Sequence, residues 1–181
     1  FRESPSPDRI HERNSMNFKH LKTIAISSVL VGALSVSSYA TSIGGATVTA
    51  SSLKLRSAPD INAAVFGLSP QNSVVVVGEK LSEGWYKVVY RGTTGYMSSE
   101  FLNFSENLEG TFGNGTIFGT GVRLRDSASL NSNVIGVFDN GIQMQVLGVF
   151  GGWYKVKYGS QTGFVFSDYF SLNGGIADLA D

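Results

Sequence analysis

Apolar and polar residues alternate with a period of two along much of the chain. Residues 142–146 read IQMQV, which places three apolar side chains on one face of an extended strand and two glutamines on the other. Residues 86–90 and 154–158 place Tyr, Val and Tyr on one face. Each is followed by a short Gly-containing turn and a second apolar segment, so we expect an antiparallel hairpin in both places. No apolar stripe of helical period accompanies these strands, and the pattern predicts an all-β fold.

The pattern occurs twice. Residues 84–88, GWYKV, return at 152–156, and residues 53–56, LKLR, return as VRLR at 122–125. The tryptophans are 68 residues apart, whereas Leu55 and Leu124 are 69 apart, so the copies differ by one residue in a loop. This repeat is longer than a solenoid repeat and is typical of two domains that fold separately. Several short strands with Gly-rich turns in each copy favour a small barrel, because closure removes exposed sheet edges.

Aromatic side chains must supply much of each core, because a domain of about 60 residues buries only about 60% of its unfolded surface. Most of the rings are expected in the core: Trp85, Tyr86, Tyr90, Tyr96 and Phe101 in the first copy, and Trp153, Tyr154, Tyr158, Phe164, Tyr169 and Phe170 in the second. Residues 74–77 are all valine and do not specify a buried face by themselves. Matching Gly78 with Gly148 predicts that Val74 and Val76 point inward.

Residues 16–40 have the three parts of a secretory signal peptide. Lys19 and Lys22 precede an apolar run at 24–36, and residues 38–40, SYA, form a small-x-small cleavage site. The run is shorter than the roughly 20 residues of a membrane span. We therefore expect a cleavable signal helix, a mature chain from Thr41 and a secreted, extracytoplasmic protein with no membrane contact after cleavage. Residues 1–15 are polar and begin without Met, and we interpret them as a non-native or over-extended N-terminus.

The residue types of the expected mature region exclude several kinds of site. The chain has no cysteine, and both histidines, His11 and His20, precede Thr41. This excludes Cys–His and Ser–His–Asp nucleophilic sites, zinc sites built on imidazole or thiolate, and disulfides. The eleven carboxylates of this region include no pair set apart for glycosidic chemistry. We therefore expect no enzymatic activity, no metal and no cofactor.

Charge also limits the partners. Nine Lys and Arg stand against eleven Asp and Glu after residue 40, with no basic run and no Gly-rich phosphate loop. A nucleic-acid partner is therefore not expected.

Each copy resembles the bacterial Src-homology 3-like domain, SH3b. The family pattern opens with apolar-Asn-Val-Arg-x-Gly-Pro, continues with Gly-Trp-x-x-Val and closes with Thr-Gly-aromatic-Val. The first copy has LKLRSAP at 53–59, GWYKV at 84–88 and TGYM at 94–97, and the second has VRLRDSA at 122–128, GWYKV at 152–156 and TGFV at 162–165. The resemblance implies two small SH3-like β-barrels in tandem. We place them at residues 46–104 and 115–172, with a linker at 105–114 and a C-terminal tail at 173–181.

Departures from the family pattern fall in the opening loop. The family's Asn is Lys54 and Arg123, its Gly is Ala58 and Ser127, and its Pro is kept as Pro59 but replaced by Ala128. The ligand therefore cannot be carried over from the family, whereas the fold can.

The resemblance implies a secreted, non-catalytic protein that binds peptidoglycan or cell-wall peptide through two SH3b modules, with another envelope protein as a second kind of partner. Two alternatives stay open. The chain could be the targeting region of a secreted peptidoglycan endopeptidase whose catalytic domain lies beyond Asp181, or it could be an extracytoplasmic protein-interaction or sensor module.

The candidate ligand-binding residues are Trp85, Tyr96 and Arg56 in the first copy and Trp153, Phe164 and Arg125 in the second. Both tryptophans begin a strand out of phase with the row of Tyr and Val, so they could line a groove or pack under a loop. Both arginines could clamp a peptide carboxylate, or they could pair with Asp60 and Asp126.

Overall fold

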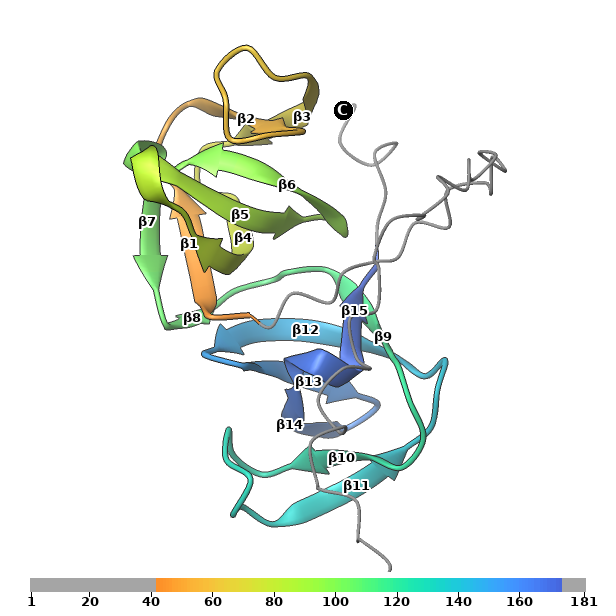
Figure 1. Ribbon diagram of the computed structural model, residues 1–181. Helices are drawn as coiled ribbons and strands as arrows, with labels where there is room; N and C mark the ends of the chain where they lie inside the picture. Colours follow the sequence, from red (N-terminus) through yellow and green to blue (C-terminus); the bar gives the residue numbers. More distant parts are fainter. Residues whose placement is uncertain (1–41, 174–181) are drawn as a thin grey trace, which may run out of the picture. The chain divides into compact units, whose positions relative to one another are not determined.

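The computed structural model describes residues 42–173 as two SH3-like β-barrels in tandem, and it confirms the predicted all-β fold (Figure 1). Within this range the helical segments are single turns of 3-10 helix: η1 (Ser82–Gly84), η2 (Ser99–Phe101) and η3 (Ser167–Tyr169). A membrane-spanning helix is not found between residues 42 and 173. The predicted signal peptide with its predicted cleavage site, the segment 1–15 and the tail from residue 174 lie outside the described residues.

The first barrel is a bent, antiparallel sheet of seven strands. The strands are β1 (Gly44–Val48), β2 (Ser52–Arg56), β3 (Val65–Pro70), β4 (Val74–Lys80), β5 (Trp85–Tyr90), β6 (Thr93–Ser98) and β7 (Leu102–Ser105). Their order in the sheet is β3-β2-β6-β5-β4-β1-β7. The central hairpin β5–β6 is the one that the sequence predicts, with Tyr90 opposite Thr93 across a two-residue turn.

The second barrel repeats this topology. Its strands are β9 (Asn114–Ile117), β10 (Val122–Arg125), β11 (Val134–Phe138), β12 (Gln143–Phe150), β13 (Trp153–Tyr158), β14 (Gln161–Phe166) and β15 (Phe170–Leu172). They follow the order β11-β10-β14-β13-β12-β9-β15, which is that of the first barrel strand for strand. A further short strand, β8 (Asn107–Glu109), pairs with β12.

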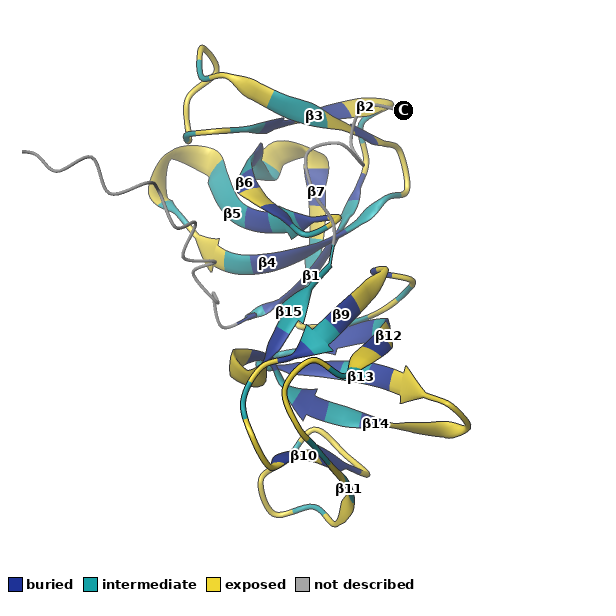
Figure 2. Ribbon diagram, turned by 90° about the vertical axis from the view of Figure 1, so that its right-hand side faces the viewer, coloured by how far each residue is buried: buried dark blue, intermediate teal, exposed yellow. Residues whose placement is uncertain are grey.

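The period-two pattern decides which residues form each core. Leu55, Val88 and Met97 are fully buried in the first barrel, and Leu124 and Val156 hold the equivalent places in the second. Figure 2 shows buried positions alternating with intermediate and exposed ones along several strands. In β12, Met144 and Val146 are buried while the two glutamines are exposed, as the alternation of residues 142–146 predicts.

The predicted register of β4 is wrong. Val75 and Val77, not Val74 and Val76, point into the first barrel's core. The pairing of β4 with β5 shifts register between Val77 and Glu79, and the pairing of β12 with β13 shifts between Val146 and Gly148. Val77 is therefore equivalent to Val146, and the predicted match of Gly78 with Gly148 is displaced by one residue. A displacement of one residue exchanges the inward and outward faces of β4.

The outer face of β4 is covered as well. Val76 belongs to a buried cluster with Phe112, and Val74 packs against the same cluster. Both Phe112 and Leu108 come from the segment that connects the barrels, and Leu108 also pairs through β8 with Val149 of β12. An all-valine strand suits this position because both of its faces are buried.

Three of the rings expected in the core are exposed. Phe101 is 40% exposed, Tyr158 41% and Tyr169 51%. Phe101 and Tyr169 end the 3-10 turns η2 and η3 with the side chain outward, while the next residues, Leu102 and Phe170, are buried. The sequence pattern gives side-chain directions for strands but not for these short turns, so it could not show that Phe101 and Tyr169 point outward.

Close packing of neighbouring strands explains why the Thr-Gly-aromatic motif contains a glycine. A Cβ atom on Gly95 would lie 2.7 Å from the carbonyl oxygen of Arg56, and one on Gly163 would lie 2.6 Å from that of Arg125. Only glycine lets β6 approach β2, and β14 approach β10, this closely. The motif thus fixes the backbone of both arginines.

Candidate functional site

Each barrel has a surface hollow at the same end, between the long loop after its second strand and the start of its fifth strand. The hollow of the second barrel, called hollow 2 below, has a volume of about 360 Å³. It is lined by Thr120, Gly121, Val122, Arg123, Arg125, Leu130, Trp153, Phe166 and Tyr169.

The first barrel has the equivalent hollow, called hollow 1, with a volume of about 450 Å³. It is lined by Ala50, Ser52, Leu53, Lys54, Arg56, Ile61, Trp85, Ser98, Glu100 and Phe101. The lining follows the repeat: a tryptophan, two basic residues of one strand, an aliphatic residue of the loop and the exposed ring that ends the 3-10 turn occur in both.

Strand register places the two tryptophans. Trp85 begins β5 opposite Ser98 of β6, and Trp153 begins β13 opposite Phe166 of β14. Both are out of phase with the inward row of their strand, so they lie on the outer face where the hollow opens. Trp153 is only 9% exposed because Phe166 packs against it in a T-shaped arrangement with 5.2 Å between ring centroids.

The two arginines hold the loops above the hollows. Arg56 Nη1 donates a hydrogen bond to the carbonyl of Ala63 at 3.0 Å, and Arg125 Nη1 donates to that of Ser132 at 2.7 Å. In both barrels the acceptor lies seven residues after the arginine, at the far end of the loop. Each guanidinium therefore has a structural partner in the loop and still lines the hollow.

The aspartates that we considered as arginine partners bind within the loops instead. The Asp60 carboxylate accepts a hydrogen bond from the backbone N–H of Asn62, and the Asp126 carboxylate accepts from the backbone and side chain of Asn133.

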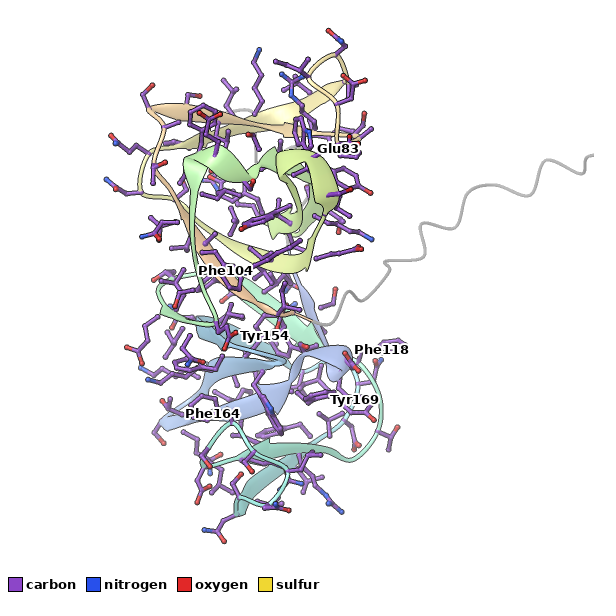
Figure 3. The ribbon with its side chains drawn as sticks, turned by 60° about the vertical axis from the view of Figure 1, so that its left-hand side comes forward. Glu83, Phe104, Phe118, Tyr154, Phe164 and Tyr169 are labelled. Carbon is purple, nitrogen blue, oxygen red and sulfur yellow. The ribbon has the colours of Figure 1, made fainter. Side chains whose placement is uncertain are left out.

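The other two candidates lie beside the hollows. Tyr96 is opposite Lys87 and Phe164 is opposite Lys155, on the outer face of the central hairpin, and neither lines a hollow. Phe164 packs edge-on against Phe150, with 5.4 Å between centroids. Figure 3 shows Phe164 well separated from Tyr169. The structure thus brings Trp85 together with Arg56 and Trp153 with Arg125 in the lining of the hollows. Tyr96 is the strand partner of Arg56, and Phe164 is that of Arg125, but neither ring lines a hollow.

Several lining residues are not among the ligand-binding residues predicted from the sequence: Lys54, Ile61, Glu100, Phe101, Arg123, Leu130, Phe166 and Tyr169. One signal was present for Phe101 and Tyr169. Each is the first of two consecutive apolar residues that recur 68 positions apart, and successive residues of extended chain point to opposite sides. One member of each pair had to be exposed.

The residue types that line both hollows are suited to ligand binding. An indole and a second ring offer flat apolar contact, and two basic side chains offer donors for a carboxylate or for peptide carbonyls. Across residues 42–173 there is no group of three or more His, Asp or Glu side chains that could hold a metal ion.

Comparison with known proteins agrees with this fold. The family model described as "Bacterial SH3 domain" matches residues 51–103 and 120–171. A curated relative from Bacillus subtilis (strain 168), named "Putative N-acetylmuramoyl-L-alanine amidase YrvJ", is 32% identical over 143 residues, which is 73% of this chain and 27% of that protein. The chain thus spans about a quarter of this relative's length.

Two solved structures from Trichomonas vaginalis are also similar. NlpC2 aligns with 74% of this chain and 49% of its own at 17% identity, and NlpC1 with 80% and 50% at 18% identity. Both have a TM-score of 0.36. The two family matches, which cover more than half of the chain and coincide with the two barrels, decide the classification. This chain belongs to the bacterial SH3 domain family and contains two copies of that domain.

Proposed function

We propose that this chain is a secreted, non-catalytic protein that binds peptidoglycan peptides of the bacterial cell wall through hollow 1 and hollow 2. One observation carries the proposal. The two barrels keep the same hollow, with a tryptophan and an arginine at equivalent positions, although their loop sequences differ. The cell-wall context is supported by the relative, whose name describes an amidase that acts on N-acetylmuramoyl-L-alanine.

The lining residues suit an extended peptide. Aromatic faces give contact area at low entropic cost, and guanidinium groups bind carboxylates with two parallel hydrogen bonds. Peptidoglycan stem peptides are short, rich in Ala and carry free carboxylates. Two sites on one chain raise the apparent affinity for such a repetitive polymer through effective concentration.

A second candidate function is the targeting region of a wall hydrolase. It is favoured by the relative, because the similarity covers only 27% of a protein named as an amidase. Reading the coding sequence beyond Asp181 tests this candidate: a catalytic domain in the same frame would support it, and an immediate stop codon would reject it.

Co-sedimentation of the full chain with purified peptidoglycan tests the main proposal. The wild-type chain is expected to pellet with the polymer. The double variant Lys54→Glu/Arg123→Glu is expected to remain in solution with an unchanged melting temperature, because both side chains are exposed and line the hollows. Lys80→Glu/Lys157→Glu is the matched control, since it makes the same change in charge at one exposed lysine of each barrel outside the hollows.

The tryptophans are tested by Trp85→Ala and Trp153→Ala, with the melting temperature measured beside binding. Lost binding with an intact fold would support ligand contact, whereas a collapsed melting temperature would assign the ring to the structure. Failure of the wild-type chain to pellet at any salt concentration would reject the wall-binding function and favour a protein-interaction or sensor module.

A further inference from the structure

The two hollows differ at the residue opposite the tryptophan. In hollow 2 this residue is Phe166, whose ring packs edge-on against Trp153 and also lies 6.4 Å from the ring of Tyr169. In hollow 1 it is Ser98, and Trp85 is half-buried rather than buried. The indole of hollow 1 is therefore more open to a ligand, which agrees with the larger volume of that hollow.

The hollows also differ in charge. Both contain two basic side chains, but Glu100 adds a carboxylate to the lining of hollow 1. The equivalent residue of the second barrel is Asp168, 68 positions later, and it does not line hollow 2. The lining of hollow 2 is therefore basic and aromatic without a carboxylate, whereas that of hollow 1 carries both signs of charge.

Glu100 is available for a ligand. Within residues 42–173 its carboxylate has neither a hydrogen bond nor an ion pair, although Lys54 and Arg56 line the same hollow. Asp168 differs in this respect as well, because it already interacts with another part of the protein. An exposed carboxylate beside an open indole is a suitable acceptor for an ammonium group, which can contact the ring face as well.

We propose that hollow 1 alone recognises a free ammonium group on its peptide ligand, through Glu100 and the face of Trp85, while hollow 2 binds without regard to such a group. The proposal rests on the proposed peptide-binding function and assigns different selectivity to its two sites. Amino groups of this kind occur at the ends of peptides and on their basic side chains. Lys54 and Arg56 remain available in hollow 1 for a carboxylate of the same ligand.

The expected preference is modest because Glu100 is exposed. Exposed ion pairs change affinity by roughly two- to fivefold at low ionic strength. Screening should reduce this preference as the salt concentration rises.

The chain provides a reporter for each hollow, since it has two tryptophans and they lie one in each. Indole N–H signals of the full, ¹⁵N-labelled chain are followed by NMR during titration with trialanine and with N-acetyl-trialanine. Acetylation removes the ammonium group and keeps the carboxylate. It is expected to weaken binding about two- to fivefold at the Trp85 signal and to leave binding at the Trp153 signal unchanged.

The variant Glu100→Gln should reduce the preference at Trp85 with little effect on the fold, because the indole face remains. Glu79→Gln is the matched control, because Glu79 is an exposed carboxylate of the same barrel outside the hollow, and it should keep the preference. Equal effects of acetylation at both signals, or a preference that Glu100→Gln does not reduce, would overturn the inference and leave the proposed function standing.

If neither peptide shifts the indole N–H signal of Trp85 or of Trp153, the inference is wrong, whether or not the chain co-sediments with peptidoglycan. Pelleting with peptidoglycan then decides the proposed function separately.

Discussion

Replacing Arg125 by Met should destabilise the second barrel more than the equivalent change destabilises the first. Arg125 is only 7% exposed, and its guanidinium donates to the Ser132 carbonyl at 2.7 Å. A hydrogen bond to a charged group contributes about 1.5–3 kcal/mol. Methionine keeps much of the apolar stem, and the half-buried Ser132 carbonyl can regain water. We therefore expect a loss of about 2 kcal/mol in the free energy of unfolding.

Arg56→Met is the internal comparison. Arg56 is half-exposed and its hydrogen bond to Ala63 is longer, at 3.0 Å. Solvent already competes for this guanidinium, so its loss should cost about 1 kcal/mol. The pair tests whether burial sets the strength of the same loop contact in two copies of one fold.

Urea unfolding followed by tryptophan fluorescence separates the barrels. In a Trp85→Phe background Trp153 alone reports the second barrel, and in a Trp153→Phe background Trp85 reports the first. With a slope of roughly 1–1.5 kcal/mol per molar urea, 2 kcal/mol lowers the midpoint by about 1.5 M. A shift below about 0.5 M for Arg125→Met, or one no larger than that of Arg56→Met, would refute the reasoning.

Three further outcomes are expected. Gly163→Ala should cost about 1–3 kcal/mol because the added Cβ meets the Arg125 carbonyl at 2.6 Å, and thermal unfolding measures this. Phe166→Ser should expose Trp153 and move its fluorescence emission to longer wavelength, and an unchanged spectrum would contradict the packing of these rings. Burial raises the pKa of the Tyr154 hydroxyl above its ordinary value of 10.0, so stability should fall as pH rises above about 10, and phenolate absorbance should show this tyrosine titrating last.

The fold could be predicted from the sequence wherever apolar and polar residues alternate strictly with a period of two. Alternation in residues 142–146 identified Met144 and Val146 as core residues of β12. The recurrence of GWYKV predicted one central hairpin in each barrel, and both hairpins are present. These predictions depend on local chemistry alone, because a strand with one wet face must place its apolar side chains on the other.

The register of β4 could not be read in this way. Four consecutive valines include no polar residue that marks the outer face. The register shift between Val77 and Glu79 also exchanges inward and outward positions along β4, and no residue type in this segment signals it. The face exchanged by this error is also buried, because Phe112 of the connecting segment packs against it. The uniform valines agree with burial on both faces, but they do not indicate which face meets the core of the first barrel and which meets a segment more than 30 residues away.

The candidate site could be predicted only as far as it depends on local sequence. Trp85 and Trp153 could be selected because their phase within the strand is local information. Whether such a ring is open or covered depends on the residue across the hairpin, and this residue is Ser98 in one copy and Phe166 in the other. The duplication preserves the residues that build the hollow, while the cross-strand partner and Glu100 vary. A repeat that kept only the fold would have no reason to retain an exposed ring, Phe101 or Tyr169, beside each tryptophan. The persistence of that ring in both copies supports the proposal that both hollows bind a ligand.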